Sequence, residues 1–303
     1  MRIQDKLVPY LEYCEYRKEL DKKTIKAYRI DLRQYFAFIC CDEPDKEKIE
    51  AYITELHKKY KQKTVKRKIA TLKAFYNYLE EDEIISCNPF RKNKVKFKET
   101  LTLPRIIPRE EIEMLLNYMY NCLKENDLTG YKYKLRDIAV VEVLFATGAR
   151  VYEISTIRED SVNLNSGQIR IMGKGGKERY VQISNSSVLA ILKKYYMENE
   201  IKKSGCFFIN NRGKRYTEQS IRAMLKKYAK QAGIERNITP HMFRHSFATY
   251  LIEEGVDVSC VQQILGHSSI KTTQIYIHIA AKKQAEILRE MHPRNSMSIA
   301  DVA

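Results

Sequence analysis

Residues 239–278 read TPHMFRHSFATYLIEEGVDVSCVQQILGHSSIKTTQIYIH, and their spacing decides how the second half of the chain is interpreted. Thr239 and Pro240 are typical of a helix start, because threonine serves as an N-cap and proline fits the first helical position. The apolar residues that follow recur at helical spacing. His241 and Arg244 lie three residues apart, so we expect both side chains on one face of this helix.

The rest of this stretch predicts a second helix and a third piece. The second helix is expected from about Val258 to Leu265, and Gly266 closes it, which places His267 at a turn. Serines able to cap open the next segment, 268–278, and Tyr276 falls about two turns into it. The three pieces predict one surface that gathers four side chains, those of His241, Arg244, His267 and Tyr276.

Each of these signals has an ordinary interpretation when it stands alone. A His-x-x-Arg pair usually forms a solvated helix face, and a tyrosine among the 21 of this chain usually packs or lies at the surface. The combination is more specific, because TGARVYEI at 147–154 and GKGGKER at 173–179 precede the stretch and add Arg150 and Lys174. Together these residue types equip a site to attack a phosphodiester with a tyrosine.

Arg150 is open to two interpretations. It follows a predicted apolar helix, Lys134 to Thr147, that ends at Gly148 as a C-cap. An arginine there is often an ordinary ion-pair partner, here of Glu153. Alternatively, Glu153 or a neighbour holds the guanidinium while its fork grips two phosphate oxygens.

With these motifs the chain resembles the tyrosine recombinases of the phage integrase family, in the two-domain layout of the Xer type. The resemblance covers nearly the whole chain and is strongest from 147 to 278. One departure, Ala149 where the family more often has leucine, affects packing beside Arg150 and not the chemistry. The resemblance implies a catalytic set of six residues: Arg150, Lys174, His241, Arg244, His267 and the nucleophile Tyr276.

The resemblance also implies the roles of these residues. A phenol with a pKa near 10 is only about 0.1% ionised at pH 7, so its activation is worth roughly 4 kcal/mol. Arg150 and Arg244 are expected to favour both the phenolate and the charge of the pentacovalent transition state. His241 is expected to hydrogen-bond the phosphate or accept the tyrosine proton, and His267 to steady a nonbridging oxygen. Lys174 is expected to protonate the departing 5′ oxygen.

The family's reaction is a site-specific recombination of DNA. The covalent intermediate is a 3′-phosphotyrosyl link with a free 5′ hydroxyl, which keeps the bond energy, so neither metal nor ATP is implied as a cofactor. The family acts as a homo-tetramer on two double-stranded DNA sites, and a second recombinase or an accessory protein stays open. The biological outcome also stays open between integration, excision, inversion and dimer resolution. Two alternatives are a DNA-binding protein that does not cut and an activity like that of type IB topoisomerases.

Length and composition agree with a DNA partner. The 303 residues predict two domains, and 54 Lys and Arg against 38 Asp and Glu give a net charge of +16, which indicates a polyanionic partner. An acidic membrane surface or solubility alone could account for the same charge. No apolar run is long enough to span a bilayer and no secretory signal is present, so we expect a cytoplasmic protein. Seven scattered cysteines without a Cys-x-x-Cys argue against zinc or a disulfide framework.

Residues 1–90 are predicted to form a helical DNA-binding domain, which resembles the core-binding domain of the family. A single basic helix is usually a solvated face, but two in one bundle favour phosphate contacts along a duplex. Each phosphate neutralised steepens the salt dependence of affinity by roughly 0.9 in log-log slope. The residues expected to contact DNA are Lys22, Lys26, Arg29, Arg33, Lys63, Lys66, Arg67 and Lys73.

The remaining chain is predicted to contain a basic linker, 91–107, and a catalytic domain, 108–303. Because the chain starts at the core-binding bundle, the simple Xer-like layout is favoured over that of large integrases. The fold class expected is mainly α with a small antiparallel β-sheet: a helical core-binding bundle and an α/β catalytic domain. A helix over about 280–291 is expected to pack either on its own domain or on a neighbouring subunit. The strands expected are Ser161–Leu164, Gln168–Met172 and Glu178–Ile183.

Overall fold

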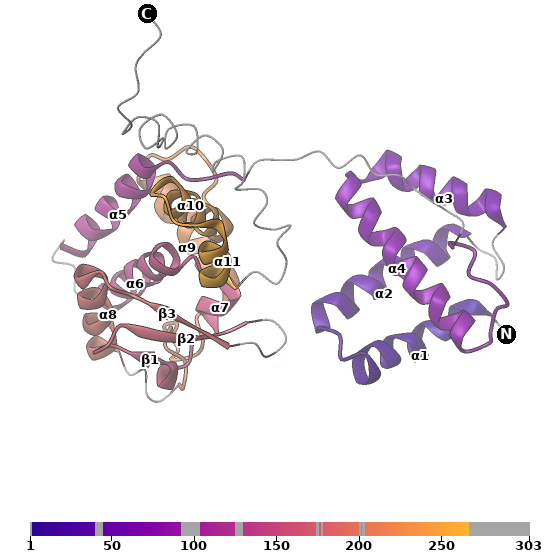
Figure 1. Ribbon diagram of the computed structural model, residues 1–303, viewed down its shortest axis with the longest axis horizontal. Helices are drawn as coiled ribbons and strands as arrows, with labels where there is room; N and C mark the ends of the chain where they lie inside the picture. The colour runs from indigo at the N-terminus through magenta and orange to yellow at the C-terminus, as the bar shows by residue number, and fades with distance from the viewer. Residues whose placement is uncertain are drawn as a thin grey trace, which may run out of the picture. The chain divides into compact units, whose positions relative to one another are not determined.

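The structure is a computed structural model that describes residues 2–39, 45–91, 104–124, 130–173, 176, 178–199, 201 and 204–266. The chain divides into two compact units, Met1–Thr100 and Leu101–Ala303, each with its own hydrophobic core (Figure 1). The predicted fold class, mainly helical with a small antiparallel sheet, is confirmed. The bounds 1–90, 91–107 and 108–303 stay a prediction.

The first unit is a helical bundle, as the sequence predicts. Its packing relies on aromatic rings, and the hydroxyl groups of Tyr35 and Tyr76 lie 2.9 Å apart in its core. Asp45 caps the third helix by accepting a hydrogen bond of 2.8 Å from the amide of Lys48. The α-helices are α1 (Leu7–Glu12), α2 (Lys22–Ile39), α3 (Lys46–Lys59) and α4 (Gln62–Glu81).

The second unit combines helices with one three-stranded antiparallel sheet of order β1-β2-β3, in which Ile169 pairs with Val181. The three predicted strands are confirmed, although β1 is shorter than expected, and α6 begins three residues before the predicted start. The short helix α7 was not predicted. The elements are α5 (Arg109–Lys124), α6 (Tyr131–Thr147), α7 (Val151–Ser155), β1 (Val162–Asn163), β2 (Gln168–Met172), β3 (Glu178–Gln182), α8 (Ser186–Glu198), α9 (Glu218–Gln231), α10 (Pro240–Glu253) and α11 (Val258–Leu265).

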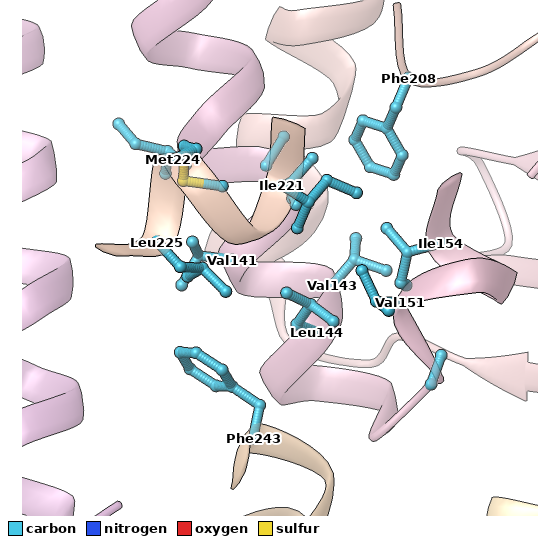
Figure 2. Close-up of a cluster of buried hydrophobic side chains, with 14 of the residues drawn as sticks. Val141, Val143, Leu144, Val151, Ile154, Phe208, Ile221, Met224, Leu225 and Phe243 are labelled. Carbon is cyan, nitrogen blue, oxygen red and sulfur yellow. The ribbon is translucent and has the colours of Figure 1, made fainter. Parts of the chain in front are cut away.

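Helix α6 is the centre of the second unit. It is buried almost all round from Leu135 to Leu144, and α5, α8 and α10 pack against it. Figure 2 shows Val151 of α7 and Phe243 of α10 directed toward the same part of this core, close to Leu144. Because Val151 follows Arg150 and Phe243 precedes Arg244, the core fixes the backbone that carries both arginines.

Two general features of the described part of the chain bear on the sequence analysis. None of its helices combines the length and the apolarity that a bilayer span requires. Its five cysteines, Cys14, Cys87, Cys122, Cys206 and Cys260, form no disulfide.

Gly148 joins α6 to the segment that carries Arg150. It is left-handed, with φ of 58°, and its amide donates to the carbonyl of Leu144, as the predicted C-cap requires. A Cβ at this position would lie 2.5 Å from Cδ1 of Phe247 and 2.8 Å from Cδ2 of Leu265. Only glycine therefore allows both this backbone conformation and the close approach of α10 and α11.

Replacing Gly148 with alanine should destabilise the protein more than its backbone conformation alone explains. We expect Gly148→Ala to lower the free energy of unfolding by about 2 to 4 kcal/mol, from left-handed strain and overpacking together. Gly213→Ala is the matched control, because Gly213 has φ of 69° but no atom within 4 Å of its added Cβ. Urea denaturation measures both variants, and equal losses would contradict the close-approach argument.

Candidate active site

Arg150 lies at the start of α7, where the chain turns after Gly148. The third residue of this helix, Glu153, reaches back and accepts a hydrogen bond of 2.7 Å from the backbone amide of Arg150. The same carboxylate accepts a hydrogen bond of 2.8 Å from the Arg150 guanidinium. The local sequence Arg-Val-Tyr-Glu thus fixes both the main chain and the side chain of Arg150.

Glu153 is a buried carboxylate, only 1% exposed, held by two arginines. Arg179 of β3 contacts both of its oxygens, with Nη1 at 2.9 Å from Oε1 and Nη2 at 2.7 Å from Oε2. Burial alone would raise the pKa of the Glu153 carboxyl. The hydrogen bonds from Arg179 and Arg150 outweigh burial and hold that pKa below its usual range.

Arg244 is buried on α10 and is 5% exposed. Its Nη1 donates to the carbonyl of Gly148 and its Nη2 to the carbonyl of Leu265, both at 2.8 Å. It therefore links the end of α6 to the end of α11.

The carboxyl end of α11 receives three arginines. Three successive carbonyls accept in turn, Ile264 from Arg179 at 3.2 Å, Leu265 from Arg244 at 2.8 Å and Gly266 from Arg150 at 3.5 Å. The last carbonyls of a helix lack partners within it and carry partial negative charge, so guanidinium groups stabilise them. This arrangement gathers positive charge at the point where the chain continues to residue 267.

The cluster formed by Arg150, Glu153, Arg179 and Arg244, hereafter the arginine cluster, has a surplus of positive charge. Three guanidinium groups against one carboxylate leave a charge of about +2. Arg150 is its most accessible member, with 38% of its side chain exposed against 13% for Arg179, while Arg244 is buried. Such a site suits an anionic ligand with several oxygens, such as a phosphate.

His241 lies in the first turn of α10, near the arginine cluster. Burial lowers the pKa of its imidazole, and the positive charges of Arg222, Arg244 and Arg150 lower it further. The ring is therefore neutral at pH 7 and able to accept a proton. Thr239 occupies the N-cap position of this helix as predicted, but its side chain makes no capping hydrogen bond.

The structure brings together three of the six predicted catalytic residues, Arg150, His241 and Arg244. Of the four side chains predicted to share one surface, only His241 and Arg244 lie among the described residues. Lys174, His267 and Tyr276 lie outside the described residues. The ion pair between Arg150 and Glu153, one of the two interpretations left open, is present.

The sequence analysis assigned no role to Arg179 or Arg222. Arg179 is the last residue of the GKGGKER motif, but its partners, Glu153 and Ile264, are distant in the chain. The one signal that could have pointed to Arg179 was Glu153, because a buried carboxylate needs more hydrogen-bond donors than a single half-exposed arginine supplies.

The predicted DNA-contact residues lie on two helices of the first unit. On α2, Lys22, Lys26, Arg29 and Arg33 are exposed, and on α4, Lys63, Lys66 and Arg67 are exposed while Lys73 is half-buried.

Arg67 has a structural partner that the sequence analysis missed. The buried carboxylate of Asp31 on α2 forms an ion pair with Arg67. It also accepts a hydrogen bond of 2.9 Å from Nζ of Lys68 and one of 3.2 Å from the hydroxyl of Thr71. Two basic residues of α4 thus anchor this helix to α2. Arg67 keeps 46% of its side chain exposed, whereas Lys68 is buried.

The pKa of His241 can be measured directly. We expect its imidazole to titrate below pH 6.5 by proton NMR, and Arg222→Met to move the midpoint upward, because that substitution removes a nearby positive charge. The folded state then binds fewer protons than the unfolded state, so the contribution of His241 to stability falls as pH drops below about 6.5.

Lys226→Met is the control for this measurement. Lys226 is an exposed cation of α9, the helix that carries Arg222, and it is not among the charges that lower the pKa of His241. A midpoint at or above pH 6.5 in the wild type, or equal midpoints for both variants, would show that the arginines do not act on His241.

Comparison with known proteins supports the family suggested by the motifs. The phage integrase family matches residues 105–283, and the phage integrase N-terminal SAM-like domain matches residues 7–83. A tyrosine recombinase of Agathobacter rectalis is 48% identical over 299 residues, which cover 96% of this chain and 97% of that protein. The tyrosine recombinase XerD of Listeria innocua is 33% identical over 306 residues, which cover 96% and 100%.

Solved structures agree with these relatives. The XerA recombinase is 28% identical, with a TM-score of 0.53 over 96% of this chain and 99% of its own. The XerH site-specific recombinase bound to a palindromic difH substrate is 22% identical and is similar in fold, with a TM-score of 0.74 over 92% and 83%. On the family match and the identities together, this chain belongs to the phage integrase family, the family of the tyrosine recombinases that it resembles.

Proposed function

We propose that this protein is a site-specific DNA recombinase that cuts and rejoins strands by tyrosine transesterification. The observation that carries the proposal is the arginine cluster at the carboxyl end of α11. It holds Arg150 and Arg244 together with a surplus positive charge, and the neutral His241 lies nearby. This is the environment that a phosphodiester needs to accept a nucleophile.

The first step is attack on the scissile phosphate by the phenol of Tyr276. The P–O bond to the new 3′-phosphotyrosyl ester forms while the bond to the 5′ oxygen breaks. Arg150 and Arg244 stabilise the extra negative charge of the pentacovalent phosphorus, because fixed guanidinium groups in a partly buried site do not have to reorganise. The same field favours the phenolate, whose formation at pH 7 otherwise costs roughly 4 kcal/mol.

Two protons move in this step. The neutral His241 accepts the phenol proton, which fits its lowered pKa. Lys174 protonates the departing 5′ oxygen, and His267 steadies a nonbridging oxygen. Strand joining reverses the step, with the 5′ hydroxyl of a partner strand as the nucleophile.

The first unit is proposed to hold the duplex. Its match to the SAM-like domain and the exposed basic residues of α2 and α4 support phosphate contacts. Arg67 can contact a phosphate while it stays paired with Asp31, since nearly half of its side chain is exposed.

A homo-tetramer on two DNA sites is proposed as the working assembly. The lambda integrase, 16% identical and similar in fold with a TM-score of 0.67, was solved as a tetramer bound to a Holliday junction. Because DNA is the substrate, we place the protein in the cytoplasm.

The alternatives make different demands on the site. A DNA-binding protein that does not cut has no need for a neutral histidine beside a cluster of arginines, and a topoisomerase-like enzyme would relax supercoils without a second site. Dimer resolution, inversion, and integration or excision of a mobile element are three biological roles that the same chemistry would serve.

A nicked suicide duplex that carries the DNA flanking the gene tests this proposal. We expect the wild type to form a covalent protein–DNA band in denaturing electrophoresis, because the nicked strand releases the 5′ hydroxyl that would reverse the attack. Tyr276→Phe should bind the same duplex without forming the band.

Tyr152→Phe is the matched control, since Tyr152 is a half-exposed tyrosine only two residues from Arg150 and should be dispensable for the band. A wild type that binds the duplex specifically but never forms the covalent complex would support the DNA-binding alternative.

A further inference from the structure

Arg179 is the member of the arginine cluster that makes the most extensive contact with Glu153. It extends from β3, is 13% exposed, and covers both oxygens of Glu153 with its two terminal nitrogens. Resting on the proposed function, we infer that Arg179 is a positioning residue: it neutralises Glu153, so that Arg150 keeps an uncompensated positive charge for the scissile phosphate.

The geometry separates the roles of the two arginines that share Glu153. The guanidinium of Arg150 donates one hydrogen bond to Glu153, from Nη1 to Oε1, whereas that of Arg179 contacts both carboxylate oxygens. A two-point guanidinium–carboxylate contact is the stronger one. Arg150 is also the more exposed of the two, at 38% against 13%, so its guanidinium is the more accessible to a ligand.

The charge balance depends on Arg179. With Arg179 present, one carboxylate is shared by two guanidinium groups. Without it, the full charge of Glu153 would act on Arg150, and a phosphate would have to compete with a buried carboxylate for the same guanidinium. Glu153 alone would place Arg150 correctly but would weaken its attraction for an anion.

Arg179 also fixes the end of α11. Its Nε donates to the carbonyl of Ile264, and its Cδ lies 3.1 Å from where a Cβ on Gly266 would be. Gly266 is left-handed, with φ of 63°, so this helix end has room for the arginine because residue 266 has no side chain. The side chain of Arg179 therefore has two effects. It balances the charge of the carboxylate that contacts Arg150, and it holds the helix end whose carbonyls Arg150 and Arg244 contact.

The first test needs neither DNA nor catalysis. Inorganic phosphate is titrated against the side-chain Nε–H signal of Arg150 in ¹⁵N NMR, with Arg150→Lys to assign the signal. We expect Arg179→Met to weaken phosphate binding roughly tenfold, the effect of losing about one charge-assisted contact. The double variant Glu153→Gln/Arg179→Met removes the competing charge and should restore most of the affinity.

Each other result overturns the inference. Unchanged binding by Arg179→Met would show that Glu153 does not compete for Arg150, and a double variant as weak as the single one would assign Arg179 a purely structural role. A wild type whose Arg150 signal does not respond to phosphate would show that its charge is not available.

The second test uses the covalent-complex assay under single-turnover conditions with saturating DNA. Arg179→Met should lower the rate of complex formation at least about tenfold, Arg179→Lys less, and the double variant should recover. A folding defect would instead reduce the final amount of complex without changing its rate. If the wild type formed complex and all variants matched its rate, the inference would fail while the proposed function stood; the phosphate titration decides the inference if no complex forms.

Discussion

The arrangement of the second unit depends on one buried carboxylate. Taking Glu153 out of water is unfavourable unless donors replace the lost hydration, and here the donors come from the Arg150 amide, the Arg150 guanidinium and Arg179. Glu153 thereby ties α7 to β3, elements that are separated in the chain by the strands β1 and β2. Arg150 and Arg179 also donate to the final carbonyls of α11, so one ionic network connects α7, β3 and α11.

Packing turns this network into a rigid site. The end of α6 approaches α10 and α11 so closely that Gly148 has no room for a side chain. Arg244 spans the same junction from the carbonyl of Gly148 to that of Leu265. A site whose charges must already be in place when the transition state forms benefits from such a junction, because no reorganisation is then required. The first unit uses the same device, with the buried Asp31 binding α4 to α2.

Residue patterns in the sequence predicted the helices and strands that depend on interactions between residues close together in the chain. The helix α10 begins where it was expected, α11 and the strands lie where they were expected, and the motifs pointed to Arg150, His241 and Arg244. Helix α7 was missed because five residues are too few to show a period, and its first turn depends on Glu153. Arg179 and the pairing of Arg67 were missed because their partners, Glu153, Ile264 and Asp31, lie 26, 85 and 36 residues away. Sequence spacing does not reveal which distant charges will meet in a folded core.

If the arginine cluster serves a tyrosine transesterification, the chemistry of the cut DNA ends must show it. The covalent complex is digested with a protease for mass spectrometry, and the released strand is offered to polynucleotide kinase without prior phosphatase. We expect a nucleotide attached through its 3′ phosphate to the peptide that contains Tyr276, and a released 5′ end that accepts label at once. An adduct on another residue, or a 5′ phosphate at the cut as hydrolysis would leave, would contradict it.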